Sequence, residues 1–248
     1  MIRLSVNVNK VATLRNSRGG AVPSVVEAAC VAVEAGAPGI TVHPRADARH
    51  ITRADVTALA ARLAPHRGRV EFNIEGDPRP DLVALVEEVL PDQCTLVPVQ
   101  PGELTSQAGW PLDTPFERMH QVVARLQARR VRVSVFVDAD VGAVDWVATL
   151  GADRVELYTE PFARAFARGR DAAHASFARF RAAAERAHER GLGVNAGHDL
   201  DLNNLTLFRS LPHLAEVSIG HALISRALFV GLDRTVREYL DVLASTAG

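Results

Sequence analysis

Eight short apolar segments recur along the chain, and a longer segment with a helical pattern follows each of them. β-Branched residues are frequent in the short segments, which is typical of buried strands. We predict strands over Leu4–Val8, Gly39–Val42, Val70–Ile74, Cys94–Val97, Val131–Val137, Arg154–Leu157, Gly193–Asn195 and Glu216–Ile219. We predict helices over Ser24–Ala35, Arg53–Leu63, Pro80–Val89, Pro115–Ala128, Val141–Leu150, Ala172–Arg190, Leu202–Ser210 and Ala222–Leu243.

This alternation predicts an α/β fold in which each helix returns the chain to a parallel strand. Glycines at 36, 151 and 191 follow predicted helices and precede predicted strands, as expected where a helix ends and a parallel strand begins. Eight such units within 248 residues favour one (β/α)8 TIM barrel domain over residues 1–248. An open doubly wound sheet is the alternative, but no G-x-G-x-x-G motif follows the first strand.

Two connections are longer than this architecture requires. The first runs from Pro98 to about Thr114, after the fourth predicted strand, and the second from Tyr158 to Asp171, after the sixth. Loops of this length in a compact domain are often functional. We therefore expect extra short helices or long loops after the fourth and sixth strands, close to the site.

The composition limits which kinds of partner and which cellular compartment we expect for this chain. A net charge of −1 favours neither nucleic acid nor a membrane surface as partner. No apolar run approaches the ~20 residues of a membrane span, and no signal peptide is visible at Met1. Cys30 and Cys94 lie far apart without a C-x-x-C pattern, which indicates two reduced thiols and a cytoplasmic protein.

Polar side chains gather where the predicted strands end, which is where a barrel of this type places its active site. They are Asn7, Asn9, Lys10, His43, Arg45, Arg49, His50, Glu71, Asn73, Asp138, Asp140, Glu156, Asn195, His198 and His221. Glu71 and Glu156 lie inside apolar runs, where an unpaired carboxylate is costly, so each is either paired with a cation or catalytic. For Asp140 we favour the cap of the helix that follows it.

The same strand ends predict binding of phosphate. Gly197 and Gly220 follow the seventh and eighth strands, where backbone N–H groups and a helix N-terminus face an anion in many barrels. Arg18, and Arg45 with Arg49 and His50, form a second candidate anion site. Two phosphate sites flanking His43, Glu71 and His198 indicate an enzyme that joins or rearranges two small phosphorylated molecules. No pair of candidate ligands has the spacing of a metal motif.

Five motifs together resemble the pyridoxine 5′-phosphate synthase family, in order and spacing, from residue 3 to about residue 245. They are Asn7–Gly19, Ile40–Ile51, Leu96–Pro98, Val194–His198 and Ile219–Ala222. The resemblance implies a barrel enzyme that forms octamers and uses neither a metal nor an organic cofactor. Its reaction condenses 3-amino-2-oxopropyl phosphate with 1-deoxy-D-xylulose 5-phosphate, releasing pyridoxine 5′-phosphate, phosphate and water. The long loop after the fourth strand would close over the site.

The resemblance also implies roles for individual residues by position. His43 and Glu71 match proton acceptors, and His198 matches the proton donor. The aminoketone phosphate would be held by Arg18, Asp199, Gly220 and His221. The deoxyxylulose phosphate would be held by Asn7, Asn9, Lys10, Arg45, His50 and Thr105.

The chain departs from the family pattern at the predicted site. Asn9 and Lys10 replace an aspartate and a histidine, Glu160 replaces a glycine, and Asp199 replaces a glycine beside His198. Three interpretations remain open. In the first, the changes accompany the same reaction. In the second, Lys10, the only lysine, forms a Schiff base with another carbonyl substrate. In the third, the barrel binds phosphate ligands without catalysis.

Overall fold

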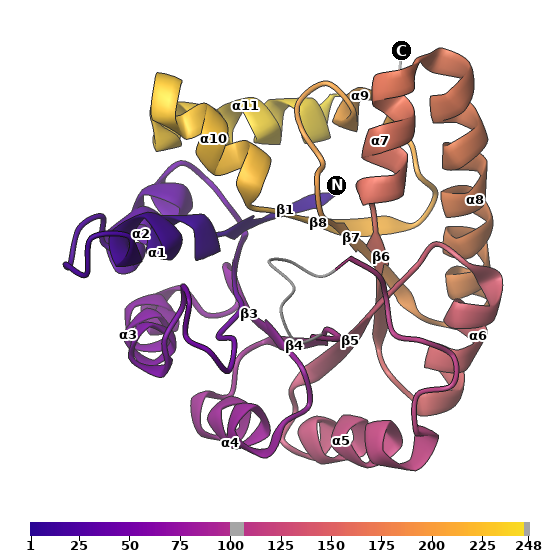
Figure 1. The fold of residues 1–248 in the computed structure, drawn as a ribbon, viewed down its shortest axis with the longest axis horizontal. Coiled ribbons are helices and arrows are strands. Elements are labelled where there is room, and N and C mark those ends of the chain that lie inside the picture. The colour runs from indigo at the N-terminus through magenta and orange to yellow at the C-terminus, as the bar shows by residue number, and fades with distance from the viewer. Residues whose placement is uncertain (100–106, 246–248) are drawn as a thin grey trace.

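A closed barrel of eight parallel strands forms the centre of the molecule in the computed structural model, which describes residues 1–99 and 107–245 (Figure 1). The strands are β1 (Arg3–Asn7), β2 (Gly39–Val42), β3 (Glu71–Gly76), β4 (Gln93–Leu96), β5 (Arg132–Val137), β6 (Arg154–Tyr158), β7 (Gly193–Gly197) and β8 (Leu214–Ile219). Each strand pairs with the next along the chain, and β8 pairs with β1 to close the barrel. The predicted fold class is confirmed.

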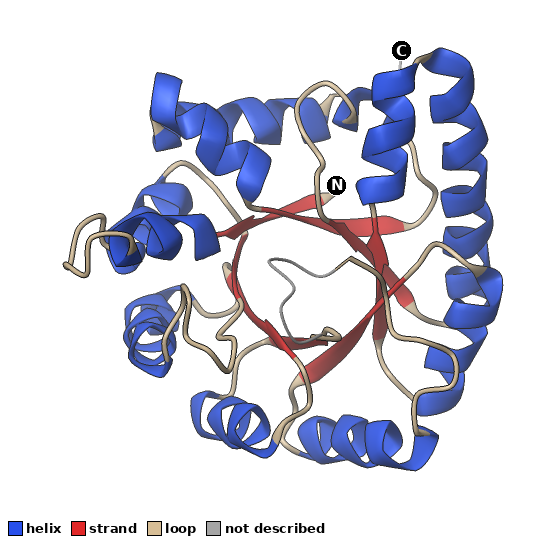
Figure 2. Ribbon diagram, viewed as in Figure 1, coloured by secondary structure: helices blue, strands red, loops and turns tan. Residues whose placement is uncertain are grey.

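Helices form an outer ring around the strands (Figure 2). They are α1 (Asn9–Asn16), α2 (Val25–Glu34), α3 (Arg53–Leu63), α4 (Pro80–Val89), α5 (Phe116–Ala128), α6 (Val141–Leu150), α7 (Glu160–Arg168), α8 (Arg170–Glu189), α9 (Leu205–Phe208), α10 (His221–Val230) and α11 (Leu232–Ala244). A short 3₁₀ helix, Ala64–His66, follows α3. Across residues 1–99 and 107–245, no helix has both the length and the apolar composition needed to cross a membrane.

The apolar core lies between the strands and the helices, whereas the interior of the barrel is polar. On β3, Phe72 and Ile74 belong to the apolar core. The alternate residues Glu71, Asn73 and Glu75 bond to polar groups of other strands, as expected when successive side chains point to opposite faces. The barrel interior is therefore a stack of polar layers.

The lower layers of this stack hold the barrel together by hydrogen bonds and ion pairs. At the floor, Arg132 Nη2 donates to Glu71 Oε2 at 2.5 Å, and Arg3 lies 3.8 Å from the same carboxylate. One layer above, Asn73 donates to Thr41 Oγ1 at 3.3 Å and accepts from Thr95 Oγ1 at 3.1 Å. These contacts leave the upper layer, at the carboxyl ends of the strands, to form the site.

Three helical features go beyond the sequence-based expectations. Helix α1 was not predicted, because only Val11 and Ala12 of its side chains are buried. The connection from Tyr158 to Asp171, where extra short helices or a long loop were predicted, contains the short helix α7, which buries Phe162 against the aromatic side chains of α8 and α9. The single helix predicted near the C-terminus is two helices, α10 and α11, which meet at Gly231 with a φ of 87°.

The connection after β4 is described from residue 107 onward, and this part packs on the barrel rim. Trp110 donates from its indole Nε1 to the carbonyl oxygen of Leu96 at 2.9 Å and from its backbone to that of Phe136 at 3.1 Å. Gly109 lies so close to β5 that a Cβ there would be 2.3 Å from the Cα of Val137. This glycine allows the chain to cross the end of β5.

Candidate active site

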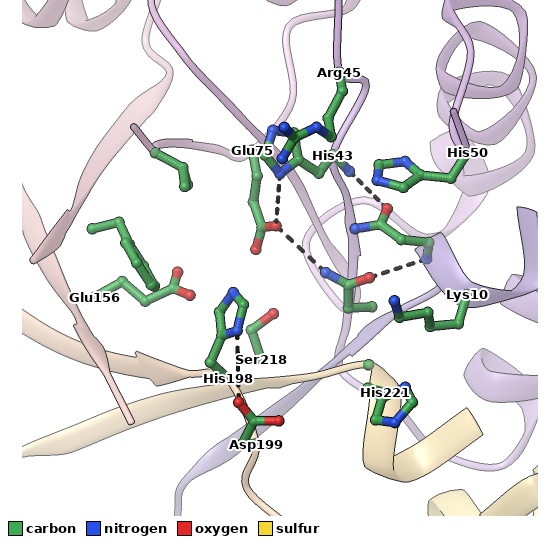
Figure 3. Close-up of a pocket in the computed structure, with 15 residues that line it drawn as sticks. Lys10, His43, Arg45, His50, Glu75, Glu156, His198, Asp199, Ser218 and His221 are labelled. Atoms are coloured by element: carbon green, nitrogen blue, oxygen red, sulfur yellow. Dashed lines mark hydrogen bonds and ion pairs between the residues drawn. The ribbon is translucent and has the colours of Figure 1, made fainter. Parts of the chain in front are cut away.

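A cavity of about 320 Å³ opens at the carboxyl ends of the strands, inside the barrel rim (Figure 3). Its walls are mostly polar and come from nearly every strand end or the turn that follows it. The lining residues are Asn7, Asn9, Lys10, His43, Arg45, His50, Glu75, Val97, Phe136, Glu156, His198, Asp199, Ser218, Gly220 and His221. This is the position at which (β/α)8 barrels carry their active sites.

His43 and Glu75 lie side by side in the pocket wall (Figure 3). His43 follows β2, and Glu75 is the last inward-facing residue of β3. The His43 Nδ1 and Glu75 Oε2 atoms lie 3.9 Å apart, and Asn7 donates to the same carboxyl oxygen at 3.4 Å. Among the described residues, the buried Nε2 of His43 has no hydrogen-bond partner, so it is available to a substrate.

Burial controls the protonation of this pair. It lowers the pKa of the His43 imidazole well below its ordinary value, and the neighbouring His50 lowers it further. Burial raises the pKa of the Glu75 carboxyl well above its ordinary value, with a further increase from the Glu156 carboxyl. Burial, followed by the nearby Glu216, also raises the pKa of Glu156, to about 8. These shifts favour a neutral imidazole at His43 and protonated carboxyl groups at Glu75 and Glu156.

Helix α1 builds one wall of the pocket from the first turn after β1. The Asn9 backbone N–H donates to Asn7 Oδ1 at 3.0 Å, and Asn9 Oδ1 accepts from the His43 backbone N–H at 2.9 Å. The side-chain amide of Asn9 therefore orients the backbone at His43. Lys10 projects from the same turn with an exposed side chain at the pocket mouth.

The end of α1 also holds the loop that carries His50. Asn16 Nδ2 donates to the His50 carbonyl oxygen at 2.9 Å, and Arg15 Nη2 donates to it at 3.2 Å. Arg15 is itself anchored by two hydrogen bonds to Asp55 at the start of α3. Burial, and after it the nearby Arg45 guanidinium, lowers the pKa of His50 to about 4. His50 is thus a neutral hydrogen-bonding group beside a buried arginine.

His198 and Asp199 form a turn directly after β7. Both have backbone conformations in the left-handed region, with φ of 82° and 58°. The His198 ring packs against two aromatic rings, with centroid distances of 5.6 Å to Phe136 and 5.3 Å to Tyr158. The Asp199 carboxylate lies 4.0 Å from His198 Nδ1. Among the described residues it neither caps a helix nor pairs with an arginine.

Two glycines leave room for the site. A Cβ on Gly197 would lie 2.4 Å from Glu156 Oε1, so a side chain there would displace that carboxyl group. Gly220 precedes the first turn of α10, and a Cβ there would meet Asn7 at 3.1 Å. The N-terminus of α10 thus opens into the pocket beside His221, an arrangement suited to an anion.

Most of the residues predicted from the sequence come together in this pocket. The structure places ten of them in its wall: Asn7, Asn9, Lys10, His43, Arg45, His50, His198, Asp199, Gly220 and His221. Arg18 is exposed after the end of α1 and does not line the cavity. Thr105, predicted to hold a substrate, lies outside the described residues.

Glu71, predicted from the sequence as a proton acceptor, does not lie in the pocket. It stands at the opposite end of β3, where its carboxylate pairs with Arg132 and Arg3 at the floor of the barrel. Glu75, four residues further along the same face of the strand, lies in the pocket where Glu71 was predicted. The signal for Glu75 was present, because Glu71, Asn73 and Glu75 alternate along β3, but the predicted strand stopped at Ile74.

Four further lining residues did not enter the predicted site: Val97, Phe136, Glu156 and Ser218. The sequence identified Glu156 only as a carboxylate that must be paired or catalytic. In the structure it is buried at the pocket floor and lies 3.4 Å from the Thr95 hydroxyl. Within residues 1–99 and 107–245, no group of three or more His, Cys, Asp or Glu side chains is arranged to hold a metal ion.

Neutral imidazoles, protonated carboxyl groups and anion-binding groups at one barrel rim define a (β/α)8 enzyme that performs acid–base chemistry on phosphorylated ligands. Residues 4–245 match the family described as pyridoxal phosphate biosynthesis protein PdxJ. The chain belongs to this family.

Relatives named pyridoxine 5′-phosphate synthase match almost the whole chain. The protein of Porphyromonas gingivalis is 49% identical over 245 residues, which are 98% of this chain and 100% of that one. The protein of Bacteroides thetaiotaomicron is 51% identical, with 98% and 100% covered. The protein of Xanthomonas axonopodis pv. citri is also 51% identical, with 98% and 97% covered.

Solved structures with lower identity share the fold. Phosphoribosyl anthranilate isomerase from Thermotoga maritima matches with a TM-score of 0.61 and 12% identity, covering 98% of both chains. KGPDC from Streptococcus mutans matches with a TM-score of 0.63 and 11% identity, covering 98% and 97%. These similarities concern the barrel alone.

Proposed function

We propose that this chain is a pyridoxine 5′-phosphate synthase and that His43, Glu75 and His198 carry its proton transfers. The reaction condenses 3-amino-2-oxopropyl phosphate with 1-deoxy-D-xylulose 5-phosphate and releases pyridoxine 5′-phosphate, phosphate and water. The observation that carries the assignment is the meeting of these three side chains in one pocket of a chain that matches the family over residues 4–245.

His43 and Glu75 act on the protons that must leave carbon atoms during ring formation. Burial keeps His43 neutral at neutral pH, so its imidazole can accept a proton. Burial raises the pKa of the Glu75 carboxyl and so favours its protonated form. The ammonium group of the aminoketone favours the ionised carboxylate once it binds beside it, and Glu75 then accepts a proton as well.

His198 serves as the proton donor that helps water and phosphate to leave. It lies across the pocket from His43, on the turn after β7. Its role requires the protonated imidazole. Burial lowers the pKa of His198, and the adjacent Asp199 carboxylate opposes this effect and so favours the protonated form. The two functions, proton acceptance and donation, are thus placed on opposite walls.

The phosphate groups are held by the two sides of the mouth. The N-terminus of α10, with Gly220 and His221, supplies backbone donors for one phosphate. Arg45 and His50, supported by Lys10, supply cationic and neutral donors for the other substrate. Arg18 is too exposed in this structure to be given a binding role.

The two alternative functions have less support. A lysine that forms a Schiff base is usually desolvated or placed beside another cation so that it loses its proton. The Lys10 side chain is exposed at the mouth, which favours a binding role. A barrel that only bound phosphate ligands would not need the buried His43–Glu75 pair, whose desolvation costs free energy.

The decisive test compares two isosteric variants on one strand. Glu75→Gln should lower kcat at least about 100-fold, because the amide cannot exchange a proton with the substrate. Glu71→Gln, at the floor, should keep kcat within about threefold while lowering the melting temperature through loss of its ion pairs. Product is followed by mass spectrometry and phosphate by a colorimetric assay. Equal activity losses in the two variants, or no turnover by the unmodified protein, would refute the proposal.

The proposal includes a cytoplasmic location and an octamer, both expected from the family resemblance. Light scattering after gel filtration tests the octamer, for which the mass should be eight times that of the 26.7 kDa chain.

A further inference from the structure

We propose that Thr159 is a positioning residue for His198, because its hydroxyl group fixes the backbone turn from which the imidazole enters the pocket. Thr159 lies between β6 and α7, at the N-terminus of the helix that the sequence did not predict. It does not line the cavity and therefore acts through His198. This inference rests on the proposed role of His198 as proton donor.

The contacts of Thr159 all lead to the same turn. The Thr159 side chain is fully buried, and its Oγ1 donates to the Gly197 carbonyl oxygen at 2.7 Å. The same hydroxyl also contacts the His198 carbonyl oxygen as a donor. The Thr159 backbone N–H donates to the Gly197 carbonyl oxygen at 2.9 Å. A hydroxyl has one proton, so the two carbonyl groups share it.

The turn needs such support because its backbone conformation is unfavourable. His198 and Asp199 are consecutive non-glycine residues with positive φ, which costs free energy at each position. Such conformations persist where the surrounding structure holds them. Among the described residues, Asn204 Nδ2 bonds to the Asp199 carbonyl oxygen at 3.0 Å, and Thr159 holds the two carbonyl groups before it.

The His198 ring is constrained separately by Phe136 and Tyr158. Their centroid distances to the ring, 5.6 Å and 5.3 Å, are within the range of aromatic contact. The side chain is therefore held by rings from β5 and β6, and the backbone by the hydroxyl that follows β6. Both constraints are needed to aim the imidazole, because ring contacts alone leave the Cα free to shift with the turn.

Removing only the hydroxyl tests the backbone constraint. In Thr159→Val, Gly197 retains its bond from the residue 159 backbone N–H, whereas the His198 carbonyl loses the hydroxyl as a donor. We expect kcat to fall about 10- to 100-fold, because small displacements of a catalytic group have effects of this size. KM for both substrates should change by less than about threefold, since Thr159 does not touch them. Thr159→Ser restores the hydroxyl and should recover kcat to within about threefold.

The chain offers a matched control in Thr235. This residue is also fully buried, its hydroxyl donates to the Gly231 carbonyl oxygen at 2.8 Å, and it lies on α11 away from the pocket. Thr235→Val should lower the melting temperature as Thr159→Val does but leave kcat unchanged. Equal losses of kcat in the two Val variants would overturn the inference, as would an unchanged kcat in Thr159→Val or equal impairment by Ser and Val.

A spectroscopic measurement separates this inference from the proposed function. The His198 ring resonances, assigned by their loss in His198→Gln, should move in Thr159→Val and return in Thr159→Ser. This result does not depend on turnover, so the inference can hold or fail even if the proposed reaction is wrong. If the Val variant does not fold, Thr159→Ala removes the same hydroxyl and is judged by the same two measurements. Unmoved ring resonances would count against the positioning role.

Discussion

Asp199 directly follows His198, the proposed proton donor, at a position where the family resemblance implies a glycine. Burial lowers the pKa of His198, and the Asp199 carboxylate opposes this effect. Lys10, on α1, lowers the same pKa, whereas Glu160, on α7, raises it. The Asp199 carboxylate therefore acts on His198 electrostatically, without contact with a phosphate.

This balance predicts the direction of a pH shift. A proton donor must be protonated, so activity falls as pH rises through the pKa of His198. Asp199→Asn removes the opposing carboxylate and should lower that pKa, which moves the basic limb of the kcat profile to lower pH. Glu160→Gln should move it in the same direction by less, because its carboxylate has the smaller effect. The profile is measured from kcat across the pH range; a shift to higher pH in Asp199→Asn would contradict this account.

The error at Glu71 shows what the sequence could and could not reveal about the site. Residue type and strand position were enough to predict His43 and His198, since each follows a strand directly. Choosing between Glu71 and Glu75 required the end of β3, because both face the barrel interior on the same side of the strand. The two carboxylates differ in their neighbours, which are cations at the floor for Glu71 and another carboxyl group for Glu75.

At the scale of elements, strands were easier to predict than helices. Each strand is covered on its outer face by apolar helices, so its sequence contains a run of apolar β-branched residues. Helices α1 and α7 are short and lie in segments for which the sequence predicted no defined helix. Helix α1 contributes Asn9 and Lys10 to the pocket wall, whereas α7 follows Thr159, which contacts the turn of His198 from outside the cavity.

The cap of helix α6, which was predicted from the sequence, can be tested directly. Asp140 Oδ1 accepts hydrogen bonds from the backbone N–H groups of Gly142 at 2.8 Å and Ala143 at 3.1 Å, as predicted for a helix cap. Asp140→Ala should reduce the free energy of unfolding by about 1 kcal/mol. Asp140→Asn should have little effect, because asparagine is as good a cap. Urea denaturation measures both, and equal losses would argue against capping.

For the molecule as a whole, the polar barrel interior links stability to pH. The folded state raises the pKa of Glu156 from 4.5 to about 8, mainly by burial. This carboxyl group therefore stabilises the fold fully below the lower value. The contribution is lost progressively as pH rises through the upper value, because the folded state then has to bury a charge.

Glu156→Gln removes this dependence. The variant should gain melting temperature relative to the unmodified protein, and the gain should be larger at about pH 9 than at about pH 5. Exposed Glu185→Gln serves as the control and should show no such difference. The measurement is thermal unfolding followed by circular dichroism at both pH values. A gain that did not depend on pH would mean that Glu156 is ionised in the folded protein throughout.

Strand β3 carries one acidic group at each end of its inward face, and the two are about 13 Å apart at the usual rise per residue. One group closes the base of the barrel by ion pairs and the other faces the ligand cavity. Because hydrogen-bonded layers separate them, substitutions at the mouth can accumulate without disturbing the base. Selection or design can thus alter what the barrel binds while the ion pairs that stabilise its base stay unchanged.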